Sequence, residues 1–190
     1  MGHVTHPAAN LVGQQVGWFA CVIGAAQGHP VLGAGTGVLI TLAHLASVPD
    51  RRGELRLLAL AAGLGLVFET MLQAAGLLTY ASPWRAVPWI CPPWILVLWI
   101  QFASTLRYGL RWLLPHPVLA GALGAVGGPM AFRAGQALGA VRFAPDGWRS
   151  LAALALVWAV AMPLLTAAAR RANQAADRGG LGKNGLVRAT

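Results

Sequence analysis

Six apolar runs follow one another along this chain, and each is close to the length that crosses a lipid bilayer. A helix needs about 20 apolar residues to cross the hydrocarbon core, because each residue adds only about 1.5 Å. The runs are Leu11–Ala26, Val31–Val48, Leu57–Leu78, Pro92–Trp112, Val118–Ala140 and Ser150–Ala169. This pattern predicts an all-α fold, a polytopic membrane helix bundle with about six transmembrane helices.

The composition excludes an ordinary soluble domain. Of the 190 residues, 57% are hydrophobic and only 10% are charged, whereas a soluble domain has about 25% charged residues. The net charge of +9 would suit nucleic acid, but the basic residues lie in short connections and in the C-terminal tail. That distribution is typical of membrane proteins, so we expect no nucleic-acid partner.

The chain divides into a short N-terminal segment (1–10), a six-helix transmembrane domain (11–169) and a basic tail (170–190). No lysine or arginine precedes the first run. A secretory signal needs such a basic region, so we interpret Leu11–Ala26 as a retained helix. The tail is polar and rich in glycine, and we expect it to be disordered in the cytoplasm.

The basic residues also predict the orientation of the bundle. If both ends of the chain are cytoplasmic, ten bases lie inside: Arg51, Arg52, Arg56, Arg107, Arg111, Arg170, Arg171, Arg178, Lys183 and Arg188. Only Arg85, Arg142 and Arg149 then lie outside, and Arg133 falls within the fifth run. Because loops rich in lysine and arginine stay in the cytoplasm, this asymmetry predicts an N-in, C-in topology.

A carboxylate near the middle of the third run is the first candidate for function. Gly65, Glu69, Gln73, Gly76 and Tyr80 recur every three or four residues, so they share one helix face. A charged side chain at mid-bilayer costs about 2.5–3.5 kcal/mol. Two interpretations stay open: a ligand, proton or cation site, or a hydrogen-bonded carboxyl that holds helices together.

Other polar side chains in the fourth and fifth runs could join the same pocket. Trp94, Gln101 and Thr105 recur at helical spacing in the fourth run, and Arg133 and Gln136 lie one turn apart in the fifth. Gly127-Gly128-Pro129 is expected to interrupt the fifth helix, either as a break whose ends face a ligand or as a proline kink tolerated by packing. The predicted ligand-binding set is Glu69, Gln73, Tyr80, Trp94, Gln101, Thr105, Arg133 and Gln136.

No catalytic or metal-binding motif is found. The chain contains no G-x-S-x-G, H-E-x-x-H or P-loop sequence, and its histidines are scattered between different boundaries. Cys21 and Cys91 form no metal-ligand spacing and no disulfide framework. We therefore expect neither a metal nor a cofactor, and the catalytic residues of any enzyme activity stay unknown.

Four short motifs, in their order and spacing, carry a family resemblance. They are Gly17-Trp18-Phe19-Ala20-Cys21-Val22, Gly76-Leu77-Leu78-x-Tyr80, Pro93-Trp94-x-x-x-Leu98-Trp99-x-x-Phe102-Ala103-x-Thr105-Leu106 and Gly127-Gly128-Pro129-x-Ala131. The chain resembles a family of small bacterial inner-membrane proteins whose domain has no assigned function. Members are often encoded near relatives of cyclopropane-fatty-acid synthase, and often have aspartate in place of Glu69. The resemblance implies a multi-pass inner-membrane protein with a role close to membrane lipids.

Three classes of function follow. The first is a non-enzymatic protein that binds or moves a small apolar or amphiphilic, lipid-like molecule in a pocket between the third, fourth and fifth spans. The second is a membrane enzyme acting on a lipid or isoprenoid, with Glu69 as acid or base; a faint likeness to carotenoid-synthesis enzymes rests on Glu69, Gly76, Tyr80 and Trp94. The third is a structural subunit, with a helix-packing partner or a second copy of the chain.

The N-in, C-in topology can be tested by thiol labelling of intact cells. We expect Ser47→Cys and Ala189→Cys to resist an impermeant reagent, because both positions are predicted to face the cytoplasm. Asp146→Cys, in the outer loop between the fifth and sixth runs, is expected to react. Labelling of both Ser47→Cys and Ala189→Cys from outside would contradict the topology.

Overall fold

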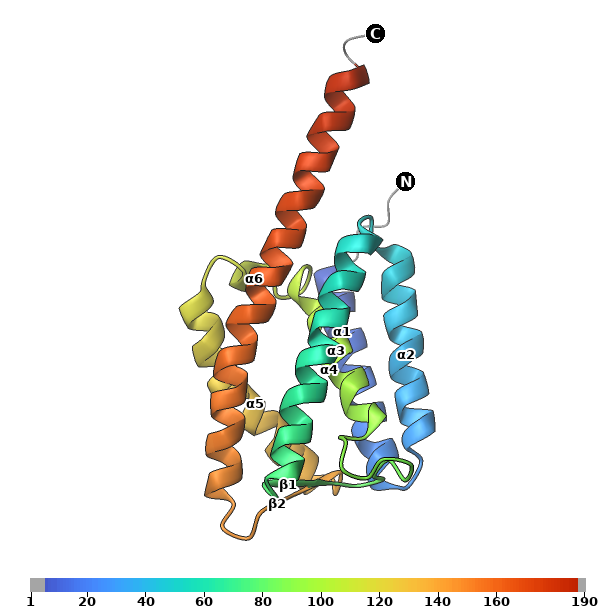
Figure 1. Cartoon of the computed structure of the whole chain (residues 1–190). Helices are drawn as coiled ribbons and strands as arrows, with labels where there is room; N and C mark the ends of the chain where they lie inside the picture. The colour runs from blue at the N-terminus through green and yellow to red at the C-terminus, as the bar shows by residue number, and fades with distance from the viewer. Residues whose placement is uncertain (1–5, 188–190) are drawn as a thin grey trace.

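The computed structural model describes residues 6–187, with side chains up to residue 178. Six α-helices account for most of this part of the chain (Figure 1). The elements are α1 (Pro7–Ala26), α2 (Pro30–Ser47), α3 (Arg51–Ala74), β1 (Leu78–Tyr80), α4 (Pro93–Leu106), the short 3-10 helix η1 (Arg111–Leu113), α5 (Pro117–Ala137), β2 (Val141–Phe143) and α6 (Trp148–Val187).

The helices run up and down in turn, so that α1 begins and α6 ends at the same end of the bundle (Figure 1). We call this the arginine-rich end, because it carries Arg51, Arg52, Arg56, Arg107, Arg111, Arg170, Arg171 and Arg178. The opposite end carries the two short strands and is called the strand end. The predicted asymmetry of charge therefore corresponds to the two ends of one molecule.

Four of the described helices, α2, α3, α5 and α6, are long and apolar enough to cross a membrane. With almost no strand, the structure is a helical membrane bundle, and the predicted fold class is confirmed. α4 has 14 residues, which is about 21 Å of helix against a hydrocarbon core of about 30 Å. That all six helices cross the bilayer, with both ends inside, stays a prediction.

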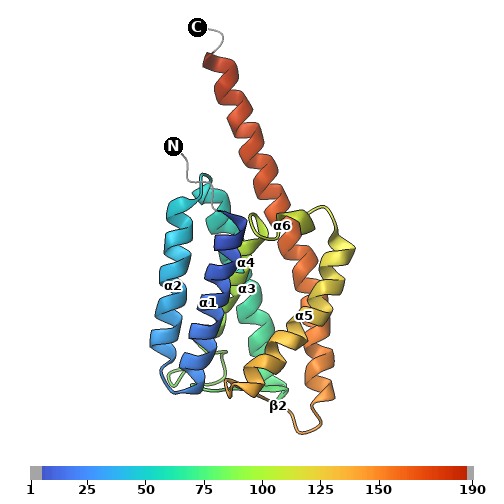
Figure 2. The same cartoon turned by 180° about the vertical axis from the view of Figure 1, so that it is seen from behind.

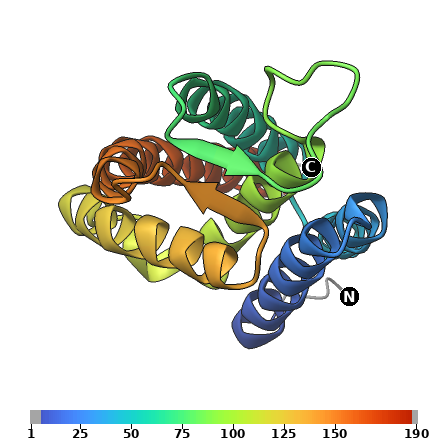
Figure 3. The same ribbon diagram turned by 90° about the horizontal axis from the view of Figure 1, so that it is seen from below.

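The helices form two outer pairs around a central helix. α1 packs on α2 and α5 packs on α6, while α4 contacts α1, α2 and α3. Viewed from the strand end, the α1–α2 pair lies on one side of α4 and the α5–α6 pair on the other (Figure 3). Trp99 on α4 and Leu154 and Leu165 on α6 are among the buried residues of the core.

Glycines let α5 approach α6 closely, and α5 is continuous through Pro129. A Cβ atom on Gly124 would overlap the backbone of α6 at Trp158, and one on Gly128 would overlap the Trp158 side chain. The expected break of the helix at Gly127-Gly128-Pro129 is therefore wrong, because α5 contains Pro129 without ending there. The glycines serve close helix packing, as small residues commonly do in membrane helices.

Two glycines turn the chain from helix into strand at the strand end. Gly76 (φ 69°) and Gly139 (φ 85°) follow the last turns of α3 and α5, in the left-handed conformation that glycine adopts most readily. Backbone bonds from Leu77 to Leu72 and from Ala140 to Gly135 complete a Schellman motif at each helix end. β1 and β2 then pair antiparallel, with Thr79 opposite Arg142.

Several boundaries differ from the sequence-based prediction. α3 runs Arg51–Ala74 rather than Leu57–Leu78. α1 begins at Pro7 rather than Leu11, since proline at the first helical position needs no hydrogen-bond acceptor. α4 ends at Leu106 rather than Trp112, because the chain turns after Arg107. The described helix α6 continues to Val187, where a disordered tail was expected after Ala169; the alanines and arginines that follow are strong helix formers.

Candidate functional site

A cavity of about 320 Å³ lies between α1, α4, α5 and α6. Almost all of its wall is apolar, and aromatic side chains contribute most of it: Trp18, Tyr80, Trp94, Trp99, Phe102, Trp112, Phe132 and Trp158. Leu123, Gly127 and Ala131 of α5 also line it. These three residues are exposed, so the cavity opens on the side of the bundle that α5 forms.

Three polar groups of the aromatic wall are used within the protein, whereas Nε1 of the wall residue Trp158 is buried without a hydrogen-bond partner among the described residues. The indole of Trp94 donates to the carbonyl of Ala81 (3.2 Å) and that of Trp99 donates to Glu69 (2.8 Å). The Tyr80 hydroxyl also donates to Glu69. The rings of Trp99 and Trp158 stack at a centroid distance of 4.6 Å. The cavity therefore presents mainly apolar groups, and Gln14 and the unpaired Trp158 indole are polar exceptions among its lining residues.

Glu69 is fully buried on α3, behind this wall and not among the residues that line it. Its two carboxyl oxygens accept hydrogen bonds from Tyr80 (2.5 Å) and Trp99 (2.8 Å). Because α3 ends at Ala74, Glu69 lies about 8 Å from the helix end, nearer the strand end than the middle of the span. The strand β1 carries Tyr80 back over the helix to meet it.

The remaining polar residues of the predicted set on α3 and α4 point elsewhere. The Gln73 amide donates to the carbonyl of Pro88 in the connection before α4 (2.7 Å). Gln101 is buried toward the opposite side, where its amide donates to the carbonyl of Gly37 on α2 (3.2 Å). The Thr105 hydroxyl donates to Phe102 of its own helix (2.7 Å). They form three separate contacts rather than one pocket.

Arg133 and Gln136 lie apart from Glu69. Arg133 is exposed on α5, and its guanidinium is 3.5 Å from the amide oxygen of Gln136. The predicted set therefore divides. Glu69, Tyr80 and Trp94 come together, with the rings of Tyr80 and Trp94 at 5.9 Å, and the other five residues do not join them.

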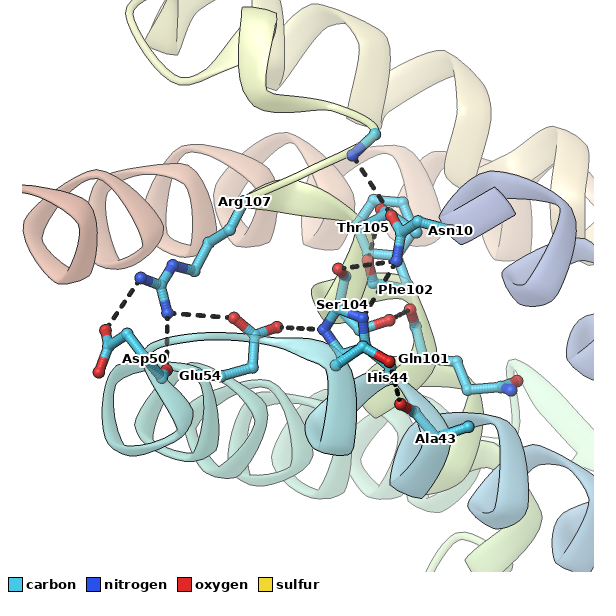
Figure 4. Close-up of polar contacts among 12 residues, drawn as sticks. Asn10, Ala43, His44, Asp50, Glu54, Gln101, Phe102, Ser104, Thr105 and Arg107 are labelled. Atoms are coloured by element: carbon cyan, nitrogen blue, oxygen red, sulfur yellow. Dashed lines mark hydrogen bonds and ion pairs between the residues drawn. The ribbon is translucent and has the colours of Figure 1, made fainter. Parts of the chain in front are cut away.

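A second polar cluster lies inside the arginine-rich end (Figure 4). Arg107, at the end of α4, donates to the carboxylates of Glu54 (3.1 Å) and Asp50 (2.9 Å). The imidazole of His44 is 2.9 Å from the other oxygen of Glu54. Glu54 is fully buried, and Arg107 and His44 are nearly so. Such a network neutralises charges that would be costly to bury alone.

Asn10 extends this cluster to α1 (Figure 4). Its amide oxygen accepts from the N–H of Gly109 (3.3 Å), which fixes the orientation of the amide. The amide nitrogen therefore faces Ser104 O (3.3 Å) and Nδ1 of His44 (3.4 Å). His44 then accepts at Nδ1 and donates from Nε2 to Glu54. The ring is positioned from both sides.

Two further contacts define the edge of the cluster. Arg107 donates from Nε to Asn173 (2.8 Å), which ties α4 to α6 just beyond the predicted membrane boundary. Burial raises the pKa of Asp50, but the Gly53 N–H and the Arg107 guanidinium outweigh burial and hold the pKa below its ordinary value. Its contribution to stability is therefore present at neutral pH and is lost as pH falls below the usual carboxyl range.

Comparison with known proteins places the chain in a family. Residues 7–164 match the family described as "Protein of unknown function (DUF2878)". The chain belongs to the DUF2878 family. No curated protein and no solved structure is significantly similar to it. The resemblance to a family without an assigned function is confirmed, and the match covers the membrane bundle of this DUF2878 chain as far as Leu164 of α6.

The described part of this DUF2878 chain offers no site for a metal ion. No group of three histidine, cysteine, aspartate or glutamate side chains within it is arranged to hold one. Cys21 and Cys91 are both free and buried. The described residues of this DUF2878 chain present the aromatic cavity and two buried polar clusters as candidates for function.

The sequence-based set missed the Arg107 cluster. Asp50 and Glu54 lie between the second and third predicted runs, outside every predicted span, and Arg107 is counted only as a cytoplasmic base. The sequence signal that could have found this cluster is the position of its residues along the helices. Acids at the start of one helix and an arginine at the end of the next helix lie at the same end of an up-and-down bundle. Asp50 also stands where a helix N-cap is expected, and its side chain accepts from Gly53 N.

The Arg107 cluster predicts a stability difference between two arginines of this DUF2878 chain. Arg107→Met leaves the buried Glu54 without its cation, and we expect a loss of about 3–5 kcal/mol in the free energy of unfolding. Arg149→Met is the matched control, because Arg149 pairs with Asp146 at 3.0 Å but both are exposed. Its loss is expected to stay below about 1 kcal/mol.

Unfolding in mixed micelles, titrated with dodecyl sulfate, measures both variants. Glu54→Gln combined with Arg107→Met is expected to cost less than the sum of the single changes, since no buried charge is then left unpaired. Equal losses for Arg107→Met and Arg149→Met would contradict the assigned role of the cluster.

Proposed function

We propose that this protein binds a small apolar or amphiphilic, lipid-like molecule in the cavity between α1, α4, α5 and α6, within a bacterial inner membrane. The observation that carries this proposal is the cavity itself: about 320 Å³, mainly apolar, and open on the side of the bundle that α5 forms. Ligand pockets in proteins have volumes of about 300–1,000 Å³. A solid core in this position would have favoured a purely structural subunit.

The chemistry of the wall supports an alkyl or isoprenoid chain as the bound part of the ligand. The polar atoms of Tyr80, Trp94 and Trp99 are satisfied within the protein, so hydrogen bonds to a ligand are left to few wall groups, such as Gln14 and the Trp158 indole. Methylene groups against aromatic faces gain van der Waals contact. A ligand that reaches the cavity from the membrane avoids transfer through water.

The proposed site lies elsewhere in the bundle than the pocket expected from the sequence. That pocket was expected between the third, fourth and fifth spans, with Glu69 in its wall. Glu69 instead holds two wall residues, Tyr80 and Trp99, from behind. One side of α5 packs on α6. Another side of α5 lines the cavity together with α1 and α4.

Quenching of tryptophan fluorescence tests the binding site. Trp18, Trp94, Trp99, Trp112 and Trp158 line the cavity, so 9,10-dibromostearate bound there is expected to quench a large share of the emission in detergent, and unbrominated stearate is expected to reverse it. Ala131→Phe projects a ring into the cavity. This ring is expected to exclude two methylene groups of the ligand, each worth about 0.8 kcal/mol, so the affinity is expected to fall about tenfold.

Ala134→Phe is the matched control on the same helix. Ala134 is exposed and is not among the residues that line the cavity, so its affinity is expected to equal that of the wild type. Quenching that stearate cannot reverse, or equal affinities for Ala131→Phe and the wild type, would contradict binding in this cavity.

A membrane enzyme with Glu69 as acid or base is the second candidate, because a fully buried carboxyl contacts the wall of the cavity through Tyr80. Both carboxyl oxygens are occupied by neutral donors, which favours positioning over proton transfer. In Glu69→Gln the amide can accept from Trp99 and donate to the Tyr80 oxygen, so both contacts persist without an ionisable group.

Glu69→Gln therefore distinguishes the two functions. Under the binding function we expect it to bind dibromostearate as the wild type does and to restore the lipid profile of a deletion strain. Glu69→Ala leaves two buried donors unsatisfied and is expected to lose about 1–3 kcal/mol of stability for each. A Glu69→Gln protein that binds normally but fails to restore the lipid profile would support the enzyme instead.

A further inference from the structure

A second cavity, of about 290 Å³, lies at the arginine-rich end between the turn after η1, the start of α5 and α6. Its apolar lining residues are Leu114, Pro117 and Ala167. Its polar lining includes Gln174 and the exposed Arg170 and Arg171, which follow Ala167 along α6. Figure 2 shows the start of α5 beside α6 at this end of the bundle.

The position of this second cavity matches the boundary between hydrocarbon and head groups. The last apolar run ends at Ala169, and Arg170 and Arg171 follow it directly. The apolar lining residues therefore lie at the level of the acyl chains, while the arginines lie at the level of the phosphates. Such a division suits a molecule that is apolar at one end and anionic at the other.

The two arginines have no protein counter-ion in the described side chains. The ion pairs found among residues 6–178 use Arg107 and Arg149 as cations. Along α6 the next acid is Asp177, six residues beyond Arg171, which is about 9 Å along the helix. Two neighbouring guanidinium groups thus line the cavity without an acid among the described side chains to neutralise them.

The helix that begins at this cavity adds to the positive field. α5 has 21 residues, and the side chain of its N-cap residue, His116, makes no capping bond. The first turn of a helix carries unsatisfied N–H groups and a partial positive charge, which favours an anion nearby. The Thr166 hydroxyl is already bonded within α6, so the arginines and Gln174 are the side-chain donors that remain.

We propose that this second cavity binds the phosphate of an anionic phospholipid head group. A guanidinium group binds a phosphate through a pair of parallel hydrogen bonds. Arg170 and Arg171 supply two guanidinium groups. Leu114, Pro117 and Ala167 contact the glycerol and the first methylenes. This site is separate from the aromatic cavity and does not depend on the function proposed for it.

Calorimetric titration of the purified full-length protein in a non-ionic detergent tests the site. The probes are dioctanoyl phosphatidic acid, dioctanoylglycerol, which lacks the phosphate, and inorganic phosphate. We expect saturable binding of phosphatidic acid, and no measurable binding of the other two at the same concentrations. The pocket variant Arg170→Gln/Arg171→Gln is expected to bind phosphatidic acid at least about tenfold more weakly, since two charge-assisted contacts are lost.

Arg52→Gln/Arg56→Gln is the matched control. It removes two exposed arginines from the same end and is expected to keep wild-type affinity. Ala167→Phe fills the cavity without changing charge and is expected to weaken binding as the pocket variant does. Equal affinities of the pocket variant and the control, or equal binding of dioctanoylglycerol, would overturn the proposal. If inorganic phosphate bound as tightly as phosphatidic acid, the proposal that the bound phosphate belongs to a lipid would be overturned.

Discussion

The charge of Arg107 is the constraint on which the arginine-rich end of the bundle depends. A guanidinium at the end of a membrane helix needs acceptors, and here they come from Asp50, Glu54 and Asn173. His44 holds the second oxygen of Glu54, and Asn10 holds His44. α1, α2, α3, α4 and α6 thus meet around one cation. α5 takes no part in the cluster, and exposed residues of α5 line the open side of the aromatic cavity.

The strand end is organised by backbone hydrogen bonds instead of charges. Gly76 and Gly139 end α3 and α5 in the same way, and the strands that follow pair with each other. Ser150 at the start of α6 donates to Leu77 (2.6 Å), which joins a third helix to this pair. The geometry places Tyr80 over Glu69. The aromatic cavity therefore extends from the hydrogen-bonded strand end toward the Arg107 cluster at the arginine-rich end.

The membrane class and the approximate helices could be predicted because apolar length and base asymmetry depend only on local sequence. Glu69 was found for the same reason, since a carboxylate inside an apolar run is visible without a structure. The direction of each polar side chain was not. Gln101 and Thr105 share a stripe with Trp94, yet the partner of Gln101 is a backbone carbonyl of α2. Which helix lies against which face is set by tertiary packing, which helical periodicity does not contain.

The role of Gly76 also could not be predicted from helical periodicity. On a helical wheel it shares a face with Glu69, so it was expected to be a small residue at a helix interface. In the structure it is the residue at which α3 ends. A glycine after an apolar run has both meanings in sequence, and only the hydrogen bonds that follow it distinguish them.

The length of α6 has a practical consequence for structure determination. The helix leaves the bundle as an unbroken rod (Figure 1), and the bond between Arg107 and Asn173 fixes its direction where it emerges. A soluble protein joined in helical register to this rod would keep a set orientation to the membrane. A chain of 19.8 kDa is too small to align well as single particles, and a shared helix of this kind would provide it with a rigid marker for electron cryomicroscopy.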